Sequence, residues 1–169
     1  MTTPRPLAFL MGSDSDLPTI EGALALLDEL QIGYHVRVLS AHRTPDEAAA
    51  FARDAEKNGI KVLIGVAGLA AHLAGALAAH SSLPVLGVPT DAGPLQGHDA
   101  LLSTVMMPPG IPVGTLAIGS VGAKNAALLS ARILALSDPE VAARLRAWRE
   151  ADRAKTLAKD RVVRERFKC

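Results

Sequence analysis

The sequence has very little of what a disulfide-bonded or nucleic-acid-binding protein needs. Only one of its 169 residues is cysteine, Cys169, which leaves no partner for an internal disulfide and excludes a zinc site built from several cysteines. Aromatic residues make up 3%, and the formal net charge is +1, so neither a stacking platform nor a basic face for nucleic acid is expected. We expect the partner to be a small molecule or another copy of the chain.

Long apolar runs are also absent. No run approaches the ~20 residues of a membrane-spanning helix, and residues 1–6 are too few and too polar for a secretory signal. We therefore expect a cytoplasmic protein with no membrane segment. Hydrophobic residues still make up 49% of the chain and are spread along it, which suffices for a globular domain with a real core.

Short apolar runs alternate with helical patterns five times. The run at residues 7–11, Leu-Ala-Phe-Leu-Met, is bounded by proline and glycine and is typical of a strand buried on both faces of a parallel sheet. This alternation predicts a three-layer α/β/α sandwich with a parallel, flavodoxin-like sheet, right-handed crossovers and an extra C-terminal helix. Strands are predicted at 7–11, 34–39, 62–66, 85–89 and 114–118, and helices at 17–30, 45–58, after 67 to about 80, after 99, at 121–136 and at 139–159.

We predict a single α/β domain over residues 1–169, with its core at about 7–137. The helix at about 139–159 follows the completed sheet and carries a few apolar residues, such as Leu145 and Trp148, among many charges. We expect it to pack on a neighbouring subunit as an oligomerisation helix, although a helix folded back on its own domain is the alternative. The charged tail at 160–169 is expected to fray.

The most informative stretch lies at residues 38–47, where an apolar run gives way to small polar residues and then to a helix start. Thr44, Pro45 and Glu47 combine an N-cap, a proline at the first helical position and the glutamate of a capping box. The residues just before them are predicted to form a tight turn at the carboxyl end of a strand, where open α/β sheets bind ligands. This turn contains Ser40, Ala41, His42 and Arg43.

Two histidines are the candidates for chemistry. His42 and His72 each follow a strand within a few residues, and imidazole is well matched to proton transfer near neutral pH. Arg43 suits bidentate recognition of phosphate, although a surface salt bridge with Asp46 or Glu47 is its alternative role. For His35 and His80 a surface or structural role suffices. His98 lies in a loop that could act as a lid.

The loop after the first strand, Gly-Ser-Asp-Ser-Asp at residues 12–16, is a second polar cluster. Ser13, Ser15 and the backbone N–H groups could hold a phosphate, and Asp16 could hold ribose hydroxyls. Ordinary helix capping is the alternative. The loop lacks the spacing of a dinucleotide fingerprint or a Walker loop.

Other classes fit less well. Asp14, Asp16 and Lys124 imitate the acidic residues and lysine of a phosphorylation-dependent receiver domain, but the third strand runs into Ala67-Gly68-Leu69 with no acceptor aspartate. There is no Gly-x-Ser-x-Gly elbow for acyl transfer. No pair of histidines has the spacing of a helical metal motif and no cysteine lies nearby, so a metal site is not expected.

Five motifs together resemble the PurE family of purine biosynthesis, the N5-carboxyaminoimidazole ribonucleotide mutases, over about residues 7–148. The motifs lie at residues 11–16, 40–45, 70–73, 99–103 and 122–129. The resemblance implies an isomerase, without cofactor, that moves a carboxylate from the exocyclic nitrogen of an imidazole ribonucleotide to a ring carbon. It also implies a homo-octamer whose sites are shared between subunits.

The resemblance further implies roles for individual residues. His42 would be the proton shuttle and Asp16 would bind the ribose. The phosphate would be held by Ser13, Ser15, Ser40 and Arg43, and the base and carbon dioxide by residues 67–72, which include Ala67, Gly68, Leu69 and His72.

Two residues depart from the family pattern, since Leu69 replaces a usual glycine and Ala74 a usual proline. A related branch carboxylates aminoimidazole ribonucleotide with free carbon dioxide. It typically has lysine in place of Arg43 and lacks Ala-Ala-His, so Arg43 and His72 favour the mutase.

Overall fold

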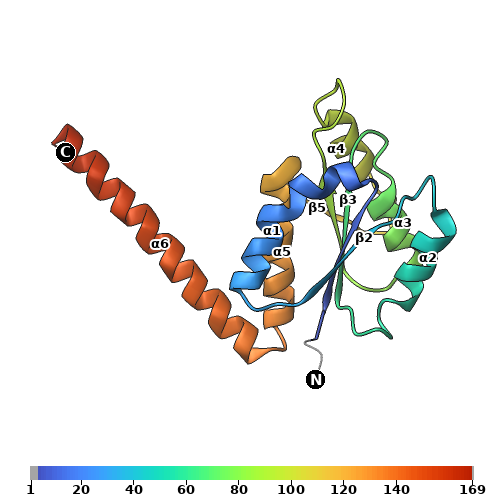
Figure 1. Ribbon diagram of the computed structural model, residues 1–169, viewed down its shortest axis with the longest axis horizontal. Coiled ribbons are helices and arrows are strands. Elements are labelled where there is room, and N and C mark those ends of the chain that lie inside the picture. Colours follow the sequence, from blue (N-terminus) through green and yellow to red (C-terminus); the bar gives the residue numbers. More distant parts are fainter. Residues whose placement is uncertain (1–3, 169) are drawn as a thin grey trace. The chain divides into compact units, whose positions relative to one another are not determined.

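The structure is a computed structural model that describes residues 4–168. Its five strands form one parallel sheet in the order β2-β1-β3-β4-β5 (Figure 1). This order and direction confirm the predicted flavodoxin-like α/β fold. The strands are β1 (Leu7–Met11), β2 (Tyr34–Val38), β3 (Val62–Ala67), β4 (Val85–Pro89) and β5 (Gly114–Thr115).

Helices cover both faces of the sheet. In Figure 1, α2 and α3 lie on one face, and α1 lies on the other with α5 as far as Ser130. Every residue of β1 and β4 is buried, as expected for strands between two helical layers. The helical elements are the 3₁₀ turn η1 (Asp14–Asp16), α1 (Leu17–Glu29), α2 (Pro45–Asp54), α3 (Leu73–His80), α4 (His98–Val105), α5 (Gly119–Ala135) and α6 (Pro139–Phe167).

The core consists of apolar side chains on the two sides of the sheet. Leu10 and Leu63 pack with Leu73 and Leu77 of α3 in one fully or nearly fully buried cluster. Burial of each such side chain stabilises the fold by about 1.5–3 kcal/mol. The N-terminal end of α3, which carries His72 just before its first turn, is thereby fixed against the sheet.

Two glycines let helices pack unusually close to the sheet, Gly65 beneath α3 and Gly87 beneath Thr104 of α4. Gly65 and Gly87 lie opposite each other on β3 and β4. A β-carbon on Gly65 would lie 2.8 Å from the Cα of Ala74, and one on Gly87 would collide with the methyl group of Thr104. Because no side chain separates them, the backbone of α3 packs directly on β3, next to the loop that follows that strand.

Two boundaries differ from the prediction in this part of the chain. β5 ends at Thr115, whereas a strand to residue 118 was predicted, and α5 begins at Gly119, two residues before its predicted start at 121. The chain leaves the sheet early because the Ala117 carbonyl packs against Gly122 in the first turn of α5. A short connection between the last strand and the helix follows.

The chain divides into two compact units, one ending at Ser130 and the other beginning at Ala131. In the second unit α6 begins after Asp138, whose carboxylate accepts hydrogen bonds from the N–H groups of Glu140 (3.0 Å) and Val141 (3.1 Å). The helix continues to Phe167, so the expectation that residues after 159 fray is wrong for 160–167. Half of the residues at 160–167 are arginine or glutamate, which are strong helix formers.

The single domain predicted over residues 1–169 stays a prediction, and Cys169 lies outside the described residues. Among residues 4–168, no helix is both long and apolar enough to cross a membrane.

Candidate active site

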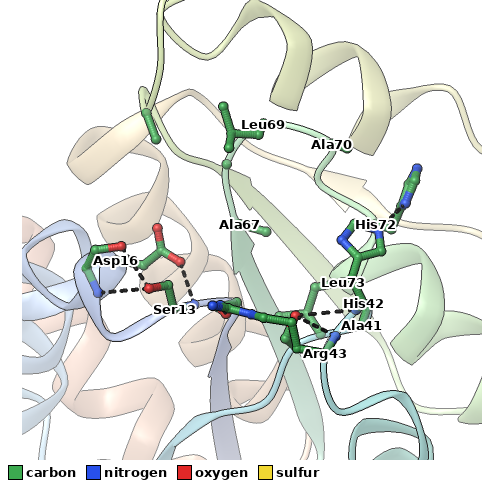
Figure 2. Close-up of a pocket in the computed structure, with 15 residues that line it drawn as sticks. Ser13, Asp16, Ala41, His42, Arg43, Ala67, Leu69, Ala70, His72 and Leu73 are labelled. Carbon is green, nitrogen blue, oxygen red and sulfur yellow. Dashed lines mark hydrogen bonds between the residues drawn. The ribbon is translucent and has the colours of Figure 1, made fainter.

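The loops that follow β1, β2 and β3 meet at the carboxyl edge of the sheet and surround a cavity of about 480 Å³ (Figure 2). This volume is in the range of sites for small molecules. The position, beside the point where the strand order reverses between β1 and β3, is the usual ligand site of open α/β sheets. Of the residues predicted for the site, all except Ala71 line this cavity: Ser13, Ser15, Asp16, Ser40, Ala41, His42, Arg43, Ala67, Gly68, Leu69, Ala70 and His72.

The first loop is ordered by its own side chains. Ser13 caps η1, because its hydroxyl accepts from Ser15 N at 3.3 Å while Asp16 Oδ2 accepts from Ser13 N at 3.1 Å. The hydroxyls of Ser15 and Ser13 are 2.9 Å apart. The capping groups also line the cavity, so capping of η1 does not prevent the same residues from contacting a ligand.

Asp16 is the one buried acidic side chain of this loop, with 7% of its surface exposed. Burial raises the pKa of its carboxyl above the ordinary value of 3.8, while the hydrogen bond from Ser13 N, the Thr90 hydroxyl and the positive charge of Arg43 oppose the rise. The Thr90 hydroxyl is itself buried beside this carboxyl. A ligand hydroxyl at Asp16 would enter a polar, largely dry environment.

The second loop is held by hydrogen bonds centred on Ser40. The Ser40 hydroxyl accepts from the N–H groups of His42 (3.3 Å) and Arg43 (3.2 Å). Thr44 Oγ1 accepts from Ser40 N at 2.8 Å and donates to Ser40 O at 3.2 Å. The capping box predicted for Thr44 and Glu47 is therefore wrong, because the Thr44 side chain is used by the turn instead of α2. The turn therefore fixes the backbone of His42 and Arg43, whose side chains are the candidates for chemistry and for phosphate recognition.

Arg43 links the first two loops. Its guanidinium Nη2 donates to the carbonyl oxygen of Gly12, and no described ion pair joins it to Asp46 or Glu47. Figure 2 shows the side chain extending across the cavity floor toward Ser13. A guanidinium and several hydroxyl and N–H donors thus point at one place, which is the arrangement that binds phosphate.

The two candidate histidines contact each other. His42 Nε2 and His72 Nδ1 are 2.7 Å apart, and the rings lie edge to face at 82° with centroids 4.8 Å apart. One nitrogen must donate and the other accept, so the pair holds one proton between the facing atoms. Both side chains are exposed to the cavity and to solvent. A proton held there can be passed to a bound ligand and recovered.

The remaining wall is apolar. It comprises Ala67, Leu69 and Ala70 after β3, together with Leu73 of α3 and Ala92 after β4. Leu73 lies in the motif at residues 70–73 but was given no role in the site. Ala92 and Thr90 were not predicted, because no sequence motif marks them. Ala71 is buried beneath this wall and does not line the cavity.

The other histidines lie away from this cavity. His35 is in β2, His80 ends α3, and His98 begins α4, where its Nδ1 contacts the Leu95 carbonyl at 3.0 Å. Within residues 4–168 no group of three or more His, Cys, Asp or Glu side chains could hold a metal ion.

The fold and the cavity are those of an α/β enzyme, with two contacting histidines at one side of the cavity and an arginine and serine hydroxyls at the other. Residues 7–155 match the model of the AIR carboxylase family, and the chain belongs to that family.

Relatives and solved structures agree with this assignment. The chain is 55% identical over 150 residues to the N5-carboxyaminoimidazole ribonucleotide mutase of Haemophilus influenzae, which covers 89% of this chain and 92% of the relative. It is 52% identical over 154 residues to the mutase of Escherichia coli, covering 91% of each. The crystal structure of Treponema denticola PurE superposes with a TM-score of 0.82 at 30% identity, covering 91% of this chain and 95% of that one.

Proposed function

We propose that this chain is an N5-carboxyaminoimidazole ribonucleotide mutase of purine biosynthesis, which converts that ribonucleotide into 4-carboxyaminoimidazole ribonucleotide. High identity to mutases over most of the chain supports this activity. The observation that carries the mechanism is the 2.7 Å contact between His42 and His72 beside an anion-binding cluster. An enzyme that moves a carboxylate within one ribonucleotide needs both parts.

The substrate phosphate is placed at the Arg43 end of the cavity. The guanidinium and the hydroxyls of Ser13, Ser15 and Ser40 converge there, and charge-assisted hydrogen bonds to such groups contribute about 1.5–3 kcal/mol each. We assign the ribose hydroxyls to Asp16, because its carboxylate is a strong hydrogen-bond acceptor beside the serine hydroxyls. This leaves the base between the histidine pair and the apolar wall.

The proposed reaction has two steps. The bond between the carboxylate carbon and the exocyclic nitrogen breaks, carbon dioxide is freed in the site, and the nitrogen gains a proton. The ring carbon then attacks the carbon dioxide and loses its own proton. One proton is delivered and one is recovered, so the reaction is balanced without a co-reactant, and no cofactor is proposed.

His42 is the proposed proton shuttle. It lies on the turn fixed by Ser40, and its Nε2 shares one proton with Nδ1 of His72. His72 acts as the partner that accepts or returns the shared proton. A single imidazole in contact with a second one can serve both proton transfers of the reaction.

Assembly and location complete the proposal. We propose that the chain forms a homo-octamer with sites shared between subunits, and that α6 is an oligomerisation helix. We also propose a cytoplasmic location, where the ribonucleotide substrate of a biosynthetic pathway would be available. Large apolar side chains such as Val38, Leu102, Met106 and Val121 are exposed on the chain, and monomers usually avoid such surface. Nucleic acid and membrane are not proposed partners.

One assay separates the mutase from a carboxylase that uses free carbon dioxide, the activity named for the family. The enzyme is incubated with the carboxyamino ribonucleotide and, separately, with aminoimidazole ribonucleotide plus bicarbonate. Turnover of the first substrate well above that of the second supports the mutase. Comparable or faster carboxylation of the amino substrate would assign the chain to the carboxylase instead.

A further inference from the structure

Thr90 is a buried polar residue directly after β4, and it does not itself line the cavity. Its side chain is 2% exposed, whereas the six residues that follow it, 91–96, are all exposed. Most buried hydroxyls in folded proteins form hydrogen bonds, so the group that a buried hydroxyl faces indicates its role. Here that group belongs to the site.

Backbone contacts fix Thr90 at the carboxyl edge of the sheet. Its N–H donates to the carbonyl oxygen of Ala67 at 2.9 Å, which joins it to the end of β3. A β-carbon on Gly97 would lie 2.8 Å from the Thr90 carbonyl oxygen, so the two ends of the exposed loop are in close contact. Gly97 has φ 81°, a conformation that suits glycine. Thr90 is therefore anchored to the sheet, although the loop that it begins is exposed.

The Thr90 hydroxyl occupies the space that Gly68 leaves. A β-carbon on Gly68 would collide with Thr90 Oγ1. On its other side the hydroxyl faces the carboxyl group of Asp16. Figure 2 shows Asp16 on the side of the cavity opposite the histidine pair. The glycine at position 68 thus allows a hydroxyl from the end of β4 to reach an acid of the first loop.

Asp16 accepts hydrogen bonds best when its carboxyl group is ionised. Burial raises the pKa of this carboxyl group, and the negative charge of Asp14 raises it further. The Ser13 N–H, the Thr90 hydroxyl and the positive charge of Arg43 lower the pKa. Ser13 and Arg43 are also proposed phosphate ligands, whereas Thr90 has no other role in the site.

We propose that Thr90 is a positioning residue for ribose recognition, because its hydroxyl donates a hydrogen bond that orients the Asp16 carboxylate toward the ribose hydroxyls. The inference rests on the proposed function, which assigns the ribose to Asp16. Ser13 N already donates to Asp16 Oδ2 at 3.1 Å. A carboxylate that accepts from two fixed donors is restricted in its rotation and keeps further lone pairs for a ligand.

The test compares variants of one buried hydroxyl. Thr90→Val replaces the hydroxyl with a methyl group of similar size, Thr90→Ala is a second variant without the hydroxyl, and Thr90→Ser keeps it. Thr104→Val is the matched control, because Thr104 is also buried and its hydroxyl donates to the Ala100 carbonyl oxygen at 2.7 Å.

Binding is measured by calorimetry with aminoimidazole ribonucleotide in buffer free of carbon dioxide. This ligand carries the ribose and the phosphate and cannot be carboxylated under these conditions. Kd is determined between about pH 4 and pH 8, a range that includes the ordinary titration of aspartate. Tm is measured at each pH, so that only folded protein is compared.

Removing the hydroxyl should weaken binding and change its pH dependence. Thr90→Val and Thr90→Ala should raise Kd roughly fivefold or more at pH 7. The loss of affinity on acidification should begin about half a pH unit higher or more, because a lost donor raises the pKa of Asp16. Thr90→Ser and Thr104→Val should keep Kd within about twofold of wild type. In the Asp16→Asn background, Thr90→Val should change Kd by less than about twofold, because the hydroxyl acts through that carboxylate.

Three results would overturn the inference. The first is a folded Thr90→Val or Thr90→Ala protein with the Kd and pH profile of wild type. The second is a Thr90→Ser protein that binds as weakly as Thr90→Val, since Thr90 would then act by packing. The third is a full effect of Thr90→Val in the Asp16→Asn background. Failure of the proposed function is seen separately, because wild type would then form no 4-carboxyaminoimidazole ribonucleotide from the carboxyamino substrate.

Discussion

Replacing His42 by asparagine tests the proposed proton shuttle most directly. Asparagine cannot exchange a proton near neutral pH, and it removes the 2.7 Å contact with His72. General acid–base catalysis contributes ~10²–10⁴-fold, which corresponds to a rise of about 2.7–5.5 kcal/mol in the barrier. We expect kcat to fall by at least a hundredfold.

Fold and substrate affinity should change little in this variant. The Ser40 hydroxyl bonds to the backbone N–H of His42, not to its ring, so the turn keeps its hydrogen bonds. The His42 side chain is exposed, and substitutions at such positions usually change the free energy of unfolding by less than about 0.5 kcal/mol. Steady-state kinetics gives kcat, calorimetry gives affinity, and urea unfolding gives stability. His80→Asn, an exposed histidine outside the cavity, is the matched control and should keep wild-type kcat.

The result that refutes the reasoning is a His42→Asn enzyme with more than about a tenth of wild-type turnover, a loss of less than ~1.4 kcal/mol. The shuttle would then be assigned to His72. If the two rings act as a unit, His42→Asn combined with His72→Asn should be little slower than the slower single variant, because residues in one hydrogen-bonded unit are not additive.

Three further predictions concern binding, pH and assembly. Arg43→Ala should weaken substrate binding by roughly tenfold or more in calorimetry, and unchanged affinity in a folded variant would remove Arg43 from the phosphate site. The pKa of Asp16 is raised in the folded protein, so its contribution to stability falls as pH rises from about 3.8 to that higher pKa and stays at its lowest above it. Asp16→Asn should therefore have a Tm equal to or higher than that of wild type at pH 7, and this advantage in Tm should be smaller below pH 4. The variant should also bind substrate more weakly. A clearly lower Tm at pH 7 would contradict the stability argument. Light scattering should return a mass near eight chains, and deletion from Ala147 onward should dissociate the assembly; a wild-type monomer at micromolar concentration, or an intact octamer after deletion, would refute the respective claim.

The fold was predictable because each layer leaves a local pattern. Strands buried on both faces are continuous apolar runs, and β1 and β4 have the predicted bounds. The helix and strand boundaries that were predicted wrongly depend on contacts with other parts of the chain or on neighbouring charged residues. β5 is shortened by the Ala117–Gly122 contact, and the charged residues beyond 159 support a helix where fraying was expected.

The polar half of the site was predictable for a related reason. Parallel strands end at a common edge, so side chains just after successive strands must approach one another. The structure brings Ser13, Arg43 and His72 around one cavity accordingly.

What sequence reasoning missed depends on exact contact geometry. The Thr44 hydroxyl bonds to Ser40 in the turn before it and makes no capping hydrogen bond to α2. Thr90 and Ala92 enter the site region through the packing of a loop that no motif marks. The left-handed backbone of Leu69 is equally invisible in a pattern of residue types.

The glycine under α3 has a consequence for how this enzyme could diverge. Gly65 leaves the backbone of α3 seated on the sheet, so any larger residue at this position must lift α3. Lifting it would move His72 away from His42 and open the apolar wall through Leu73. A saturation library at Gly65 should therefore return almost only glycine under selection for growth without purines. A library at Ala92, an exposed residue on the rim, should tolerate many residues, and this is a place where a new substrate preference could arise.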